Sequence, residues 1–205
     1  KELSYMKKEL LLRNLQAFDP EIFAFLQDEI QRQRYMLSLV PNNNAMSPFA
    51  HYLEGSLLAN SAFDALNPHA GSTDLEELAI KRTKKLFGSE HAIVRLGNIV
   101  AASRVVCLAL LEPKSRVLSF NLRKKEHCSG LSFTFKNFGI DAKKQVLDWD
   151  EVERTAQETK PHLIIFSPVS YPRNANYRRL SEIARNVGAY LWVDIGQSVG
   201  LVAAG

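Results

Sequence analysis

The most constraining feature of this sequence is an amphipathic helical segment that runs directly into a short apolar strand ending in a carboxylate. The apolar stripe of the helix consists of Leu180, Ile183, Ala184 and Val187, and Gly188 closes it. The strand covers residues 190–193 and is followed at once by Asp194. Because open α/β sheets bind their ligands at the carboxyl ends of the strands, this pattern predicts a functional acid at the rim of a sheet.

Strands and helices alternate from residue 91 onward, which predicts an α/β fold. Strands are expected at residues 91–94, 116–120, 145–147, 163–166 and 190–193. Helices are expected at residues 98–111 and over a segment capped by Asp150 and Glu153 that ends near Thr159. Such alternation is typical of a mostly parallel sheet covered by helices on both faces.

The first 40 residues are predicted to form a helical arm, and residues 41–205 a partial α/β domain. One helix is expected over residues 1–17. The next runs to about residue 37, with Asp19 as its N-cap and Pro20 in its first turn. Further helix boundaries are indicated at Ser47-Pro48, at the capping box Thr73-x-x-Glu76 and at Gly88.

Composition argues against a membrane or nucleic-acid protein. The chain is 46% hydrophobic and 23% charged, with a net charge of +4. It has no apolar run near the roughly 20 residues of a membrane span. Its densest basic cluster, residues 123–125, is better explained as solvated surface than as a nucleic-acid site. The chain begins with Lys1, which suggests a piece of a longer protein.

The cysteines indicate a reducing compartment. Cys107 lies in an apolar helical segment, and Cys128 does not form a spaced pair with it. A cytoplasmic protein is therefore predicted, with an organelle matrix as the alternative.

Several segments, in order, resemble serine hydroxymethyltransferases over about residues 19–205. They include Asp19-Pro20-Glu21-Ile22, Lys85-Leu86-Phe87-Gly88, Lys160-Pro161-His162-Leu163, Val193-Asp194-Ile195 and Gly200-Leu201-Val202-Ala203-Ala204-Gly205. The resemblance implies the large domain of a fold-type-I pyridoxal-phosphate transferase. It also implies a homodimer, or a heterodimer with an active paralogue, and serine, glycine and folate as ligands.

The resemblance also implies roles for individual residues. Asp194 matches the acid that holds the pyridine nitrogen, and His127 the histidine that stacks on the ring. Without the resemblance, Asp194 reads as a loop cap and His127 as a structural residue. The remaining candidates are Asn98 and Val100 in the phosphate segment, Ser170 beside the cofactor oxygen, Gln197 in place of a histidine, and Asp64 in place of a catalytic glutamate.

These positions depart from the family's pattern, which predicts a catalytically impaired protein. Ile99 and Val100 replace a glycine and a hydroxyl residue in the phosphate segment, which argues against tight binding of pyridoxal phosphate. The family's cofactor-binding lysine has no counterpart up to Gly205. The chain is thus interpreted as a pseudoenzyme or a fragment related to serine and glycine one-carbon metabolism.

Two other interpretations stay open. The chain can be a fragment of an active enzyme that converts serine and tetrahydrofolate to glycine and methylenetetrahydrofolate. It can also be a nucleic-acid or folate-binding module that uses the basic cluster near Lys124. The sequence beyond Gly205 and a spectrum with added cofactor distinguish the first two.

Overall fold

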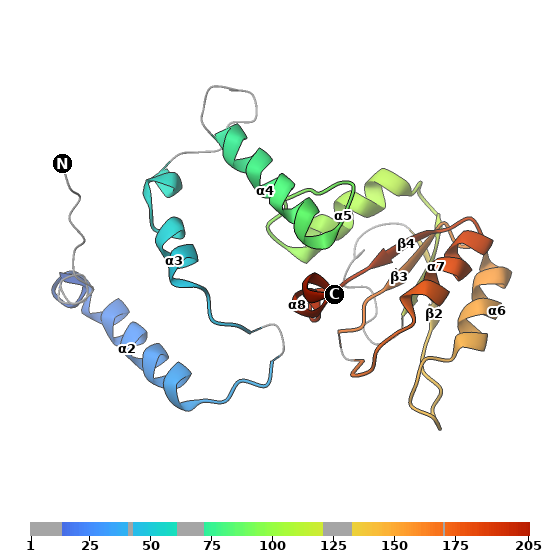
Figure 1. The fold of residues 1–205 in the computed structure, drawn as a ribbon. Coiled ribbons are helices and arrows are strands. Elements are labelled where there is room, and N and C mark those ends of the chain that lie inside the picture. Colours follow the sequence, from blue (N-terminus) through green and yellow to red (C-terminus); the bar gives the residue numbers. More distant parts are fainter. Residues whose placement is uncertain (1–13, 41–42, 61–71, 121–132, 170) are drawn as a thin grey trace. The chain divides into compact units, whose positions relative to one another are not determined.

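The computed structural model describes residues 14–40, 43–60, 72–120, 133–169 and 171–205 (Figure 1). The chain divides into two compact units, Lys1–Ala45 and Met46–Gly205. The second unit contains the sheet and the candidate site. Among the described residues, no helix combines the length and the apolar character that crossing a membrane requires.

The sheet has four parallel strands. They are β1 (Arg116–Phe120), β2 (Thr134–Phe138), β3 (Leu163–Phe166) and β4 (Tyr190–Val193), in the order β2-β1-β3-β4. Their pairing places Val117 opposite Leu163 and Ile165 opposite Trp192. All four carboxyl ends therefore share one edge of the sheet. The α/β fold predicted from the sequence is confirmed, with β1, β3 and β4 at the expected residues.

Helices α6 (Trp149–Thr159) and α7 (Tyr177–Asn186) cover one face of the sheet. Side chains of a strand point alternately to its two faces, so Leu118 and Ile164 turn toward these helices. The buried cluster on this face consists of Leu118, Phe120, Phe138, Leu147, Val152, Ala156, Ile164, Phe166, Leu180, Ile183 and Ala184. This cluster is the larger of the two cores that fix the strand ends.

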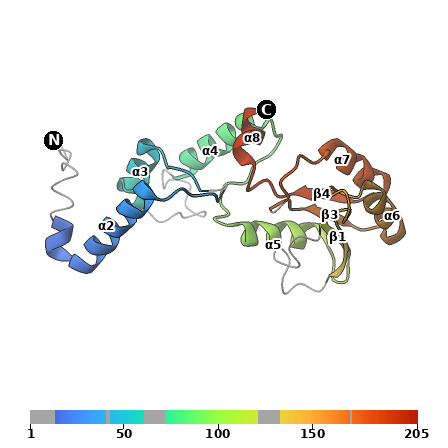
Figure 2. The same ribbon diagram turned by 90° about the horizontal axis from the view of Figure 1, so that it is seen from below.

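Helix α5 (Ile99–Leu110) packs on the other face, on the side of the sheet away from α7 (Figure 2). Cys107, near the C-terminal end of α5, packs with Val117 and Leu163, close to where β1 and β3 begin. A short connection then leads from α5 into β1. The helix therefore runs opposite to the strands, and its N-terminal end is directed toward the carboxyl edge of the sheet.

Two predicted strands are wrong. Residues 91–94 form no strand, and Ile93 is largely exposed. Residues 145–147 contribute only an isolated bridge between Leu147 and Ile140, because the Asp141 carboxylate accepts from two backbone N–H groups and Gln145 has a φ of 55°. That geometry is a turn. The strand β2 lies instead at Thr134–Phe138, where the pattern had given no prediction.

The remaining helices lie outside the two buried clusters. They are α2 (Pro20–Tyr35), α3 (Pro48–Glu54), the 3₁₀ helix η1 (Leu57–Asn60), α4 (Ser72–Phe87) and α8 (Val199–Ala204). Asp19 and Ser47 accept hydrogen bonds from backbone N–H groups of α2 and α3, as predicted. Gly88 ends α4 with a φ of 62°, which suits glycine. The helix expected over residues 1–17 lies mostly outside the described residues, as does the Thr73 side chain.

The cap of α6 differs from the prediction. Asp148, rather than Asp150, is the N-cap, and its Oδ1 accepts from the backbone N–H of Glu151 at 3.0 Å. Asp150 lies in the first turn with an exposed side chain. The sequence contains two acids, Asp148 and Asp150, separated by Trp149, and the backbone geometry makes the first of them the cap.

Replacing Asp148 with alanine is expected to lower the free energy of unfolding by about 1 kcal/mol, because a backbone N–H at the start of α6 loses its acceptor. The matched variant Asp150→Ala is expected to change it by less than about 0.5 kcal/mol, since its contact with Arg179 is exposed. Urea denaturation measures both. Equal effects of the two variants would contradict the assignment of the cap.

Candidate functional site

A hydrogen-bonded carboxylate lies where the neighbouring strands β3 and β4 end. Ser167 follows β3 and donates its hydroxyl to Asp194 Oδ2 at 2.8 Å. The backbone N–H of Gly196 donates to Asp194 Oδ1 at 2.9 Å. A Cβ at Gly196 would lie 3.2 Å from that oxygen, so glycine allows the approach. Asp194 is partly buried, and its carboxylate is held in one orientation.

Gln197 follows Asp194 by three residues in the sequence and provides a further hydrogen-bond acceptor. It lies in a turn closed by a hydrogen bond from the Ser198 N–H to the Ile195 carbonyl at 2.9 Å. Its Oε1 atom is buried and finds no donor among the residues that the structure describes. A buried acceptor without a donor is costly, so this oxygen is suited to receive a hydrogen bond from a ligand.

The start of α5 offers few donors to an anion. Asn98 caps the helix, and its Oδ1 takes the backbone N–H of Ala101 at 2.8 Å. Ile99 and Val100 follow, with 46% and 41% of their surface exposed. The hydroxyl of Ser103 donates to the carbonyl of Ile99 inside the helix. Gly97 leaves space before the cap, but the segment presents apolar side chains where a phosphate would need hydroxyls.

Arg95, which precedes this segment in the chain, is already engaged in an ion pair. Arg95 Nε lies 2.5 Å from Glu76 Oε1, a carboxylate of α4. This ion pair raises the pKa of the Arg95 guanidinium further above its usual range, chiefly through the hydrogen bond to Glu76. The guanidinium therefore ties α4 to the segment before α5.

Four of the predicted site residues can be placed. Asp194 and Gln197 lie at the end of β4, and Asn98 and Val100 at the start of α5. The other three, Asp64, His127 and Ser170, lie outside the described residues. Sequence reasoning missed Ser167. The signal that could have found it is a polar residue directly after an apolar strand, because the neighbouring strand also ends in a polar residue.

Within the described parts of the chain, no group of three or more His, Cys, Asp or Glu residues could hold a metal ion.

Comparison with protein-family models decides the relationship. The model described as serine hydroxymethyltransferase matches residues 15–205. The chain belongs to the serine hydroxymethyltransferase family. Serine hydroxymethyltransferases are in general pyridoxal-phosphate enzymes, and the parallel sheet flanked by helices agrees with the fold-type-I transferase domain.

The described residues fit the pyridine ring of pyridoxal phosphate but not its phosphate group. The Asp194 carboxylate, oriented by Ser167 and Gly196, is a suitable acceptor for a protonated ring nitrogen. The start of α5 presents Ile99 and Val100 and keeps its nearby hydroxyl inside the helix. A dianionic phosphate would lose charge-assisted hydrogen bonds there, each contributing about 1.5–3 kcal/mol. The cofactor as a whole does not fit this set of residues.

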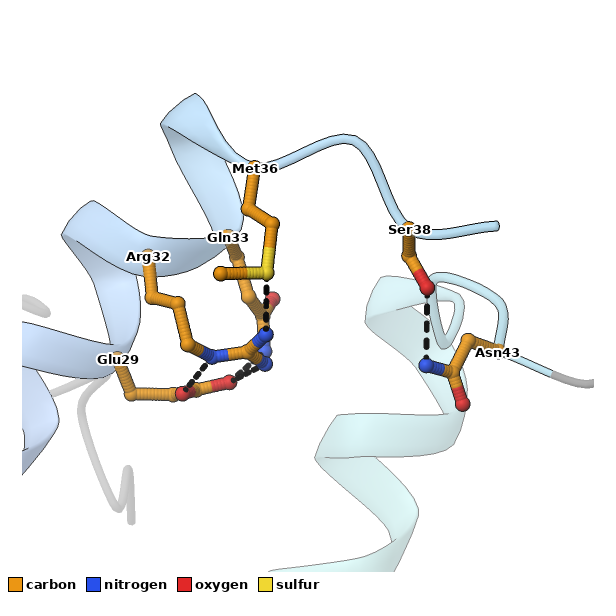
Figure 3. A network of polar contacts seen from close by, with 6 residues as sticks. All are labelled: Glu29, Arg32, Gln33, Met36, Ser38 and Asn43. Atoms are coloured by element: carbon orange, nitrogen blue, oxygen red, sulfur yellow. Dashed lines mark hydrogen bonds and ion pairs between the residues drawn. The ribbon is translucent and has the colours of Figure 1, made fainter. Parts of the chain in front are cut away.

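The first unit contains a second polar cluster, on α2 and the segment after it (Figure 3). Arg32 donates from Nε and Nη2 to the two carboxylate oxygens of Glu29, both at 2.6 Å. Gln33 donates to Glu29 Oε1 at 2.7 Å, and Asn43 donates to Ser38 at 3.1 Å. Asn43 belongs to the run of three asparagines at residues 42–44. The Glu29 carboxylate is thus engaged on both of its oxygens by its neighbours on α2.

The hydrogen bond from Arg32, followed by that from Gln33, lowers the pKa of Glu29 to about 2. A depressed pKa means that this interaction is present above the ordinary carboxyl pKa and is lost as the pH falls toward 2. In the variant Arg32→Gln we expect the Glu29 titration to return toward the ordinary range, with the exposed Arg34→Gln variant as control. The pKa of Glu29 is measured by NMR from the chemical shift of its side-chain carbonyl as a function of pH. An unchanged titration midpoint in Arg32→Gln would contradict the interaction between Arg32 and Glu29.

Proposed function

We propose that this protein is a catalytically impaired member of the serine hydroxymethyltransferase family that retains the fold and a partner surface. The observation that carries the proposal is the start of α5, where Ile99 and Val100 are exposed and the hydroxyl of Ser103 donates to the carbonyl of Ile99. A family that depends on a phosphate-bearing cofactor needs donors in this segment. The protein would act in or near serine and glycine one-carbon metabolism without performing the reaction at an ordinary rate.

Substitutions elsewhere support the same proposal. Gln197 replaces a histidine, and the acid-base glutamate has at best a shorter counterpart in Asp64. Asn42, Asn43 and Asn44 replace a segment that contains a carboxylate. Each change removes a group that could position or exchange a proton, and such groups commonly contribute 10²–10⁴-fold, about 3–5 kcal/mol of barrier.

An active glycine hydroxymethyltransferase remains the second candidate. The hydrogen bond between Ser167 and Asp194 favours it, because the acid for the ring nitrogen is kept and well oriented. Serine and a folate would then be substrates. Turnover of serine to glycine by the full-length protein with added pyridoxal phosphate distinguishes the two, since only the second predicts an ordinary rate.

We further propose that the protein forms a homodimer, or a heterodimer with an active paralogue, in the cytoplasm. Helix α2 contains no buried residue, and Phe18 and Phe25 are 90% and 73% exposed. Apolar faces of this kind are typical of protein interfaces. Sedimentation of the full-length protein at tens of micromolar is expected to give a dimer. A strict monomer that also fails to bind an active family member would contradict the proposal.

A further inference from the structure

We propose that Tyr171 is a positioning residue for the site at the ends of β3 and β4. Its hydroxyl and its ring anchor the segment that follows β3, and this segment presents the hydroxyl of Ser167 to Asp194. The inference goes beyond the proposed function. It applies equally to an impaired and to an active enzyme, because it concerns the geometry of the carboxylate and not the reaction.

The hydroxyl of Tyr171 is the acceptor for a buried backbone donor. The Leu147 N–H donates to Tyr171 Oη at 3.1 Å, although the two residues are 24 positions apart in the chain. Leu147 is 3% exposed and also forms the isolated bridge with Ile140. A buried N–H that lost its acceptor would be costly, so this hydrogen bond gives the tyrosine hydroxyl a defined place beside the segment between β2 and α6.

The ring of Tyr171 packs on the core beneath the strand ends. Its centroid lies 5.8 Å from that of Phe120, with an interplanar angle of 82°. Phe120 ends β1, and its ring lies 5.0 Å from that of Phe166, which ends β3. Edge-on contacts of this kind are a favoured arrangement of aromatic rings. The tyrosine is therefore fixed against the same rings that hold the residue before Ser167.

A short backbone connection joins Tyr171 to Ser167. The Tyr171 N–H donates to the carbonyl of Pro168 at 3.2 Å, a hydrogen bond of the i→i+3 kind that closes turns. Pro168 directly follows Ser167, and its ring restricts its φ. Little freedom remains between the anchored tyrosine and the serine hydroxyl that donates to Asp194 Oδ2 at 2.8 Å. A displacement of Tyr171 would thus be transmitted to this hydrogen bond.

Tyr177 provides a matched comparison. Its ring also packs edge-on against Phe166, at 6.0 Å. Its hydroxyl, however, makes no hydrogen bond among the residues that the structure describes, and it lies at the start of α7. Replacing either tyrosine with phenylalanine keeps the ring and removes one hydroxyl. Only the change at Tyr171 removes an acceptor from the segment after β3.

The test follows the side-chain carbonyl resonance of Asp194 by ¹³C NMR in the full-length protein, at neutral pH and below the unfolding transition of each variant. Ser167→Ala removes the donor and defines the change in chemical shift for the lost hydrogen bond. We expect Tyr171→Phe to move the resonance in the same direction by at least about half as much, because a site is only as well oriented as its supporting contacts. Tyr177→Phe is expected to leave the resonance unchanged.

Amide hydrogen exchange of Leu147 shows whether the hydrogen bond to Tyr171 has been lost. In Tyr171→Phe the exchange is expected to be at least about tenfold faster, because the buried N–H has lost its acceptor. In Ser167→Ala it is expected to stay unchanged, since the tyrosine keeps its own anchors. The two variants together show that the carboxylate responds to the tyrosine through the serine.

Two outcomes would overturn the inference. One is faster exchange of Leu147 in Tyr171→Phe with an unchanged Asp194 resonance, which would make the tyrosine a structural residue only. The other is unchanged exchange of Leu147, which would mean that Tyr171 Oη is not its acceptor. Neither outcome bears on the proposed function, which the turnover of serine to glycine tests separately.

Discussion

Replacing Phe166 with alanine is expected to lower the free energy of unfolding by about 3–5 kcal/mol, the usual cost of emptying a fully buried aromatic position. Phe166 ends β3 and has no exposed surface. Its ring lies 5.0 Å from that of Phe120 and 6.0 Å from that of Tyr177, in an edge-on contact with the latter. The change would leave a cavity between the sheet and α7 and remove these ring contacts.

The matched control is Phe25→Ala, a substitution of the same kind at a position on α2 that is 73% exposed. It should cost less than about 1 kcal/mol, because little apolar surface is buried there. Urea denaturation followed by tryptophan fluorescence measures both variants. A loss below about 1.5 kcal/mol for Phe166→Ala would mean that the cluster around Phe120 does not hold the sheet together as described.

The sequence predicted those strands whose residues form a nearly continuous apolar run. Residues 163–166 are continuously apolar, and every one of them is buried in the structure. The edge strand β2 was missed because two exposed polar residues, Lys136 and Asn137, interrupt the apolar pattern, and Phe138 alone in this strand is fully buried. Such a strand is defined by pairing with β1, which is a tertiary contact that local pattern does not contain.

The site shows the same division between local and tertiary information. Asp194 could be predicted because an acid follows an apolar strand, and the adjacent turn at Gly196 is encoded in the same few residues. The hydrogen bond from Ser167 joins positions 27 residues apart and required knowledge that β3 and β4 are neighbours. The cap at Asp148 was missed because two acids close together are equivalent in sequence and differ only in backbone dihedral angles.

The largest functional effect concerns catalysis. We expect the full-length protein, supplied with pyridoxal phosphate, serine and tetrahydrofolate, to have a kcat/KM at least about a thousandfold below that of an ordinary family member assayed beside it. Two independent deficits lead to this expectation. Among the described residues, the start of α5 presents Ile99 and Val100 and the hydroxyl of Ser103 donates to a helix carbonyl, and under the proposed function Gln197 stands in place of a histidine.

A single reversion is expected to recover little of this activity, because catalytic groups that act as a unit are strongly non-additive. Gln197→His changes one position while Ile99 and Val100 still flank the helix start. Val100→Ser restores one hydroxyl while the acid-base positions stay altered. Measured turnover should therefore remain within about tenfold of the wild-type protein in each single variant. Wild-type turnover within tenfold of the ordinary enzyme would instead show that Asp194 and its partners suffice, and would contradict the impaired-enzyme proposal.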